Sequence, residues 1–116
     1  MENILDELTQ IKDVRGTLLV GKDGLVIASA GNFENDPDFV GASMSELFST
    51  AETMSLERFS AGKPVRISLE AESITFIVYE VTEDTILAIL AESTANLGII
   101  KIETDNAVKK LQELLG

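Results

Sequence analysis

The stretch VRGTLLVGKDGLVIASAG (residues 14–31) holds two apolar runs of strand length on either side of the tetrapeptide Gly21-Lys22-Asp23-Gly24. An Asp-Gly pair between two apolar runs is typical of a β-hairpin, and Gly24 is expected to adopt a positive φ there. A phosphate-binding loop is the competing interpretation. That loop needs a Gly-Lys-Ser/Thr ending before a helix, whereas Asp23 places a carboxylate at the hydroxyl position and a second apolar strand follows. The sequence therefore predicts a hairpin.

Apolar periodicity predicts the remaining elements. Helical spacing indicates a first, a long middle and a last helix, and three further apolar runs indicate strands. Asp36 is expected to cap the middle helix with Pro37 in its first turn, Gly62 to stand at C′ after its end, and Asn96 to cap the last helix. The expected helices are residues 2–14, 37–60 and from 97 onward, and the expected strands are residues 14–21, 25–31, 63–70, 74–81 and 85–92.

The strands predict a layered α+β fold. Four of them are apolar on both faces, so the sheet needs helices on each side, with the first and last helices sharing one face and the middle helix covering the other. The strand at 63–70 is different, because Val65, Ile67 and Leu69 alternate with polar residues. This alternation, with Pro64 at the start, is typical of an edge strand with one wet face.

The composition limits the possible functions. A length of 116 residues suits a single domain over residues 1–116, and an apolar content of 45% is too high for a disordered tail. No apolar run approaches the ~20 residues of a membrane helix, and the acidic N-terminus is unlike a signal peptide, so a cytoplasmic location is expected. The chain has no Cys and no His, which excludes disulfides and thiol or imidazole catalysis. The net charge of −11 disfavours nucleic acid and anionic membrane and favours a basic partner, although simple solubility also explains it.

The middle helix carries more apolar surface than one face of a sheet requires. Its apolar arc is about 140° wide at the 100° per residue of an α-helix. The surface outside that arc is rich in small residues, which either let a second helix approach closely or simply fill solvent-facing positions. The arc comprises Val40, Met44, Leu47, Ala51 and Met54, flanked by Phe48 and Phe59.

Two segments at opposite ends of the chain resemble the Roadblock/dynein light chain family. The opening ILDELTQIKDVRGTLLVGKDGLVIAS resembles the first helix and hairpin of the family, and the closing TILAILAESTANLGIIKIETDNAVKKLQELL resembles its last strand and last helix. Together with the order of elements, the resemblance covers nearly the whole chain and is nearest to the single-domain prokaryotic, MglB-like branch. It implies a profilin- and longin-like fold, in which a five-stranded antiparallel sheet of order 2-1-5-4-3 has one helix on one face and two on the other.

The resemblance also implies a homodimer. Family members pair their third strands edge to edge, place their middle helices side by side, and act as non-catalytic regulators or scaffolds of small Ras-like GTPases. The open edge strand and the wide apolar arc fit this arrangement, because a two-fold copy covers both. The expected dimer interface comprises Val65, Arg66, Ile67, Ser68 and Leu69 in the third strand and Met44, Leu47, Phe48, Ala51 and Met54 in the middle helix.

A GTPase regulator can supply an arginine finger or order the partner's switch loops. The arginines are Arg15, Arg58 and Arg66, and none is expected on a flexible exposed loop. Surface charge or a snorkelling stem explains them, so ordering of the switch loops is the favoured mechanism. The expected GTPase-binding residues lie on the outward side of the paired middle helices and are Glu46, Thr50, Thr53, Glu57 and Arg58.

Other functions have less support in the sequence. No EF-hand pattern is present, and solvation explains the acidic residues of the last two turns, so no metal and no cofactor are expected. A small-ligand sensor or a general dimerisation or adaptor domain is the alternative. A sensor needs polar groups inside a cavity, and an enzyme is not expected without His, Cys, a carboxylate pair or a Ser-Lys motif. The acidic turn residues are Glu70, Glu72, Glu80, Glu83 and Asp84, and the polar core candidates are Thr17, Ser29, Thr75 and Tyr79.

Overall fold

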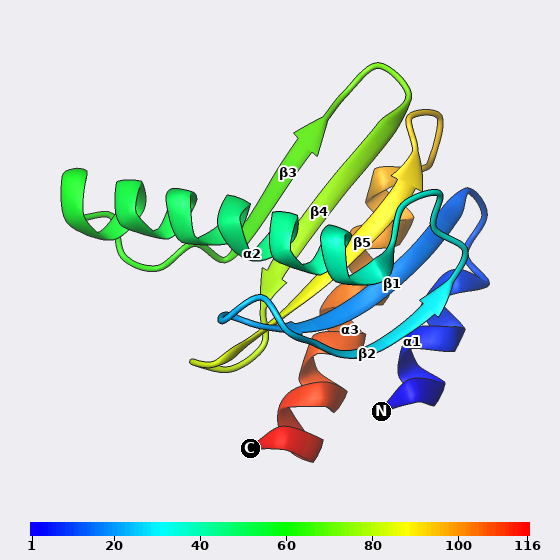
Figure 1. The fold of residues 1–116 in the computed structure, drawn as a ribbon, viewed down its shortest axis with the longest axis horizontal. Helices are drawn as coiled ribbons and strands as arrows, with labels where there is room; N and C mark the ends of the chain where they lie inside the picture. Colours follow the sequence, from blue (N-terminus) through cyan, green and yellow to red (C-terminus); the bar gives the residue numbers. More distant parts are fainter.

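The computed structural model describes residues 1–116 and contains a five-stranded antiparallel sheet between two helical layers (Figure 1). The strand order is β2-β1-β5-β4-β3, and α1 and α3 lie on the face opposite α2, so the predicted fold class is confirmed. In chain order the elements are α1 (Glu2–Thr9), β1 (Val14–Gly21), β2 (Val26–Gly31), α2 (Pro37–Thr53), the π-helical turn η1 (Met54–Arg58), β3 (Arg66–Glu70), β4 (Ile74–Glu80), β5 (Thr85–Glu92) and α3 (Leu97–Leu115).

The predicted hairpin forms between β1 and β2. The Gly24 N–H donates to the Gly21 carbonyl at 2.8 Å, and Gly24 adopts a φ of 92°. The Asp23 carboxylate accepts from the Leu25 N–H at 3.1 Å, which closes the turn locally. The glycines and Asp23 therefore serve backbone geometry in a turn, as the sequence predicts, and no helix follows them.

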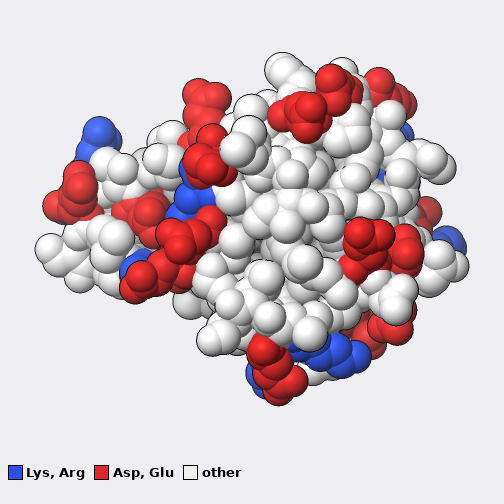
Figure 2. All heavy atoms as spheres, turned by 60° about the horizontal axis from the view of Figure 1, so that its bottom comes forward, with Lys and Arg blue, Asp and Glu red and all other residues white.

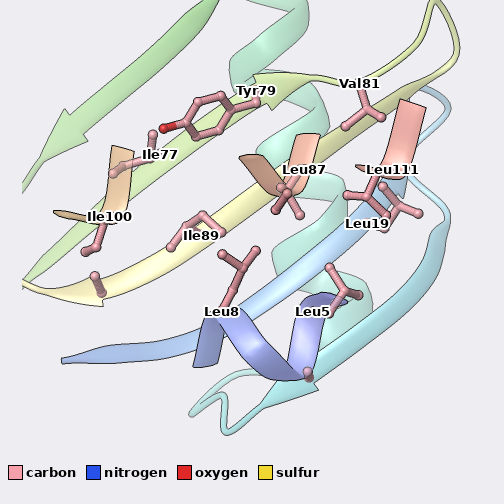
Figure 3. Packing of buried hydrophobic residues seen from close by; sticks show 13 residues of the cluster. Leu5, Leu8, Leu19, Ile77, Tyr79, Val81, Leu87, Ile89, Ile100 and Leu111 are labelled. Atoms are coloured by element: carbon pink, nitrogen blue, oxygen red, sulfur yellow. The ribbon is translucent and has the colours of Figure 1, made fainter. Parts of the chain in front are cut away.

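The face of the sheet that carries α1 and α3 holds the larger core cluster (Figure 3). Leu5 and Leu8 of α1 point toward the sheet beside Leu111 and Ile100 of α3. α3 begins where the Asn96 side chain accepts from the Ile99 N–H at 3.1 Å, so the predicted cap is confirmed. No helix of the structure is both long and apolar enough to cross a bilayer.

The opposite face of the sheet is covered by α2. The Asp36 side chain accepts from the Asp38 N–H at 3.0 Å, and Pro37 occupies the first turn, as predicted. Val40, Met44 and Phe48 then pack on side chains of β1, β4 and β5. Helix α2 therefore has its core contacts in its first three turns.

Five local expectations were wrong. The third strand begins at Arg66 rather than at Lys63, so Pro64 lies before the strand instead of at its start. α1 ends at Thr9 and turns follow it, so it is shorter than the periodicity predicts. β2 has a largely exposed face, with Ile27 46% exposed, because it is an edge strand and Ile27 falls at the register shift in its pairing with β1. The middle helix ends in the η1 turn, and Ser60 rather than Gly62 takes the positive φ directly after the helix, at 50°; Gly62 adopts its positive φ two residues later.

Candidate interaction surface

The C-terminal end of α2 has no sheet of its own chain beneath it. Figure 1 shows the last turns of α2 extending beyond β3. We call residues 54–59 the projecting end, and none of the η1 residues within it is buried. Met54 is 45% exposed and Phe59 72% exposed, which is unusual for large apolar side chains grouped at one place.

The strand β3 forms the open edge of the sheet next to the projecting end. Val65, just before the strand, is 80% exposed, and Leu69 is 41% exposed. Ile67 is half-buried against the α2-side core. The backbone groups of Arg66–Glu70 make no hydrogen bond outside the pairing with β4, so the outer edge is unpaired. An unpaired apolar edge is a ready template for another strand.

A shallow apolar groove of about 440 Å³ joins the second half of α2 to the chain that leads toward β3. Leu47, Ala51, Met54 and Phe59 supply most of its apolar lining. A second pocket of about 170 Å³ lies between the first half of α2 and the strands β4 and β5, and includes Phe39 and Phe76. Both hollows open beside exposed apolar side chains on the α2 side of the sheet.

The structure divides the expected dimer residues into two sets. One set is accessible: Val65, Arg66, Ile67, Ser68 and Leu69 lie on the edge strand or just before it, the half-buried Leu47 and Ala51 line the groove on α2, and the exposed Met54 begins η1. Met44 and Phe48 are instead 6% and 1% exposed in the chain's own core. The sequence prediction for these two residues needs correction, because α2 turns that side of its wide apolar arc toward its own sheet.

The expected GTPase-binding residues all lie at the surface. Glu46, Thr50, Thr53 and Glu57 follow one another at helical spacing and are exposed, as is Arg58. Acidic side chains are spread over the molecular face drawn in Figure 2 and basic ones are sparse there. The structure therefore leaves this side of α2 free to contact another molecule.

The small residues of α2 are used partly within the chain. Gly41 is buried against β2, and a Cβ at this position would lie 2.7 Å from Val26 Cγ2. The Ser45 hydroxyl donates to the Lys22 carbonyl at 2.7 Å. These two residues bring α2 close to the hairpin, whereas Ser49 and Thr50 remain exposed.

Lys22 forms an ion cluster that the sequence does not reveal. Its Nζ lies 2.7 Å from a Glu80 carboxylate oxygen, 3.5 Å from Glu52 and 5.1 Å from the centre of the Phe48 ring. Partial burial lowers the pKa of Lys22, but the hydrogen bond and charge of Glu80 and the charge of Glu52 outweigh it, so the net pKa is raised. Glu80 is therefore not a solvated turn residue, because on β4 it binds Lys22 of the hairpin, which Glu52 of α2 also contacts.

Carboxylates lie near two of the three arginines, but only Arg15 is hydrogen-bonded to one. Arg15 donates to both oxygens of Glu92 at 2.6 and 3.1 Å and also contacts Glu34. The hydrogen bond from Arg15 is the main cause that lowers the pKa of Glu92. Arg66 lies 4.0 Å from Asp105 and 5.8 Å from the Tyr79 ring centre. Arg58 forms no salt bridge and is exposed.

The polar core candidates for a ligand sensor do not gather around a cavity. Thr17 donates to the Leu5 carbonyl, Ser29 is exposed, and the buried Thr75 and Tyr79 line neither of the hollows described above. No group of three or more Asp, Glu, His or Cys residues is placed to hold a metal ion.

The arrangement of the helices and strands and the chain's sequence define the class of protein. The sequence model of the Roadblock/LC7 domain matches residues 1–91. The Methanocaldococcus jannaschii proteins MJ1340 and MJ0714 are 32% and 34% identical over 114 residues, with 98% of this chain and 98% and 95% of theirs covered. The chain belongs to the Roadblock/LC7 family.

Solved structures share the fold. A Roadblock/LC7 domain from Streptomyces avermitilis superposes with a TM-score of 0.92 at 23% identity, covering 99% of this chain and 97% of that one. Myxococcus xanthus MglB superposes with a TM-score of 0.90 at 18% identity, covering 97% and 92%. A further MglB structure, described as a tetrameric arrangement, gives a TM-score of 0.86 at 19% identity and covers 96% and 84%.

Proposed function

We propose that this protein is a homodimeric, non-catalytic regulator or scaffold of a small Ras-like GTPase. The observation that carries the proposal is the pairing of exposed apolar side chains at the projecting end with an unpaired, partly apolar edge at β3. Met54, Phe59, Val65 and Leu69 are between 41% and 80% exposed in the single chain. Membership of the Roadblock/LC7 family and the structural likeness to MglB support the same assignment.

The proposed dimer has a two-fold axis perpendicular to the sheet. Such an axis pairs β3 with its copy in antiparallel fashion and keeps both α2 helices on one face. Each projecting end then lies over the partner's sheet instead of in solvent. The pocket beside Phe39 and Phe76 lies on that face and is lined mainly by apolar side chains, so it suits the apolar groups of the arriving helix end.

In this dimer the two α2 helices form a shared surface for the GTPase. The outward residues Glu46, Thr50, Thr53, Glu57 and Arg58 are exposed. Intrinsic hydrolysis by Ras-like proteins is slow because the water-positioning glutamine and the switch loops are mobile, and contacts that order these loops change the rate or lifetime of the GTP state. Arg15 is held by Glu92, Arg66 lies beside Asp105, and the unpaired Arg58 belongs to the η1 turn rather than to a loop, so the proposed action is ordering of the switch loops rather than donation of an arginine.

Light scattering and a GTPase titration test the proposal. Purified small Ras-like GTPases of the source genome, loaded with GDP or a non-hydrolysable GTP analogue, are titrated with the protein. We expect a dimer mass and nucleotide-dependent binding that Glu46→Arg and Glu57→Arg weaken at unchanged dimer mass. Glu103→Arg, on the exposed part of α3, is the matched control. Binding that is insensitive to both α2 variants contradicts the assigned surface, and a monomeric mass contradicts the dimer.

A further inference from the structure

The backbone of β3 offers alternate residues to an incoming strand. The Ala71 N–H donates to the Ile74 carbonyl at 3.0 Å, which makes these two residues a hydrogen-bonded pair at the turn. Hydrogen-bonded and non-hydrogen-bonded pairs alternate along an antiparallel ladder. Leu69 and Ile67 therefore bond to β4, whereas Arg66, Ser68 and Glu70 direct their N–H and C=O groups to the open edge.

Two-fold symmetry restricts how this edge can pair with its copy. The axis keeps the two faces of the joined sheet distinct, so residues directly opposite one another must lie on the same face. Ile67 and Leu69 face α2, because their β4 neighbours Val78 and Phe76 belong to the α2-side core. Arg66, Ser68 and Glu70 face α3. The two-fold axis must therefore pass beside one residue of β3, which then lies opposite its own copy, and cannot pass between two residues. Ile67, Ser68 and Leu69 are the candidates for this central residue.

We propose that β3 pairs with β3 of a second copy in the register centred on Ser68, so that Arg66 faces the partner's Glu70. The proposal rests on the homodimer proposed above and adds its register and its specificity. In this register the whole of β3 is paired, and every outward N–H and C=O group meets a partner. Ile67 lies opposite the partner's Leu69 on the α2 face, which makes an apolar cross-strand pair.

The charges of Arg66 and Glu70 favour the register centred on Ser68 over the registers centred on Ile67 and Leu69. Glu70 is exposed and has no salt bridge within its own chain, and the only carboxylate near Arg66 is Asp105 at 4.0 Å. Centring on Ser68 places Arg66 and Glu70 opposite each other on both sides of the axis. Centring on Ile67 puts Arg66 opposite the partner's Ser68 and shortens the paired strand. Centring on Leu69 puts Arg66 opposite the partner's Glu72, outside the strand, and also shortens the pairing.

The sequence of β3 is thus self-complementary in charge. This complementarity would favour the homodimer over a heterodimer with a related chain. A paralogue with a different charge at either end of the strand would place like charges or an unpaired charge at the edge. Like charges directly opposite each other on neighbouring strands are destabilising. Arg66 and Glu70 are therefore assigned as specificity-determining residues of the dimer.

Single cysteines test the register, since the chain has no cysteine of its own. Directly opposite residues of a hydrogen-bonded pair have Cα atoms about 5.5 Å apart, whereas diagonal neighbours are about 7–8 Å apart. A disulfide is not formed beyond about 7 Å without backbone movement. Under mild oxidation we expect Ser68→Cys to give a covalent dimer and Ile67→Cys and Leu69→Cys to stay largely unlinked.

The cysteine results separate the two proposals. Preferential linking of Ile67→Cys or Leu69→Cys overturns the register while the dimer of the proposed function stands. A dimeric mass with no linking at any of the three positions overturns β3 pairing. A monomeric mass for the wild-type chain overturns the dimer itself and the register with it.

Charge reversal supplies an independent readout. Arg66→Glu and Glu70→Arg each place two pairs of like charges across the axis, and we expect either change to raise the dimer dissociation constant roughly 5- to 500-fold. Mixing the two variants restores opposite charges at both pairs, so the mixture is expected to form a heterodimer with near wild-type affinity. Glu72→Arg is the control and is expected to leave the affinity unchanged. No rescue on mixing, or a Glu72→Arg effect equal to that of Glu70→Arg, overturns the assignment.

Discussion

α2 and the projecting end that follows it both carry large apolar side chains, yet only α2 packs on the sheet of its own chain. Phe48 of α2 is 1% exposed and packs in the α2-side core, whereas Phe59 at the projecting end is 72% exposed. Both residues are phenylalanines, so composition does not explain the difference. Their position relative to the sheet does, because the last helical turns extend beyond β3 (Figure 1).

The two edges of the sheet differ in a similar way. β2 has α1 packed beside it and pairs with β1 through a register shift near Val20. Such irregularities disfavour pairing with another strand. β3 pairs with β4 without a register shift. The comparison indicates that the β2 edge is the less favourable of the two for pairing with another strand.

The largest expected effect is on the free energy of unfolding, and it differs between Phe48 and Phe59. Phe48→Ala removes a fully buried ring, and we expect the free energy of unfolding to fall by about 3–5 kcal/mol at every protein concentration. Phe59→Ala removes a ring that the single chain leaves in solvent, so its effect is expected only at concentrations at which the wild-type chain is dimeric. Urea unfolding of both variants at low and high micromolar concentration measures the difference. Equal losses at all concentrations would show that Phe59 belongs to the core of its own chain.

The next largest effect concerns association rather than folding. Met54→Asp and Val65→Asp introduce charges at exposed apolar positions on the projecting end and the β3 edge. Charges buried in an interface weaken it strongly, and we expect each change to raise the dissociation constant roughly 30-fold or more. Light scattering over a dilution series gives the mass.

Leu25→Asp is the matched control for these charges. Leu25 is 69% exposed and precedes β2 at the opposite edge of the sheet. We expect it to leave the dimer intact. A loss of mass with Leu25→Asp but not with Met54→Asp would move the interface to the β2 edge and reverse the comparison of the two edges.

Local chemistry allowed much of the fold to be predicted. The Asp23-Gly24 turn and the caps Asp36 and Asn96 act within a few residues, so their signals are complete in the sequence. The strand order came from the family resemblance, since hairpin signals alone do not say which strands become neighbours. β2 was misjudged for the same reason, because a strand's position at the edge of a sheet is a property of the whole fold.

The interaction surface was harder to predict from the sequence. The wide apolar arc of α2 correctly indicated excess apolar surface, but it did not show which flank meets the chain's own sheet. Met44 and Phe48 were therefore placed on the wrong side. The cluster of Lys22, Glu52 and Glu80 joins three elements that are far apart in the chain, and no spacing rule connects them.

A smaller effect is expected at this cluster, where Glu52 lies close to the end of α2. Lys22→Met leaves the carboxylates of Glu52 and Glu80 without their shared cation, and we expect a loss of about 1 kcal/mol because all three groups are still partly hydrated. Lys63→Met is the control, since Lys63 is more exposed and lies 3.8 Å from Glu80. Its expected effect is under about 0.5 kcal/mol. Equal losses in urea unfolding would mean that general charge, rather than the cluster, stabilises the fold.

The smallest expected effect on stability concerns the ion pair of Arg15 and Glu92 at the start of β1, and it depends on pH. The pKa of Glu92 lies below its ordinary value of 4.5 because Arg15 donates hydrogen bonds to the carboxylate. The contribution of the pair is therefore fully present above pH 4.5 and is lost as the pH falls through the lower folded-state pKa. We expect the difference in urea midpoint between wild type and Glu92→Gln to be greatest near neutral pH and to shrink in acid. Glu34→Gln removes the more exposed contact of Arg15 and should change the midpoint less. A Glu92→Gln difference that stays constant from neutral pH to pH 3 would mean that the amide is disfavoured by its packing and not by the lost ion pair.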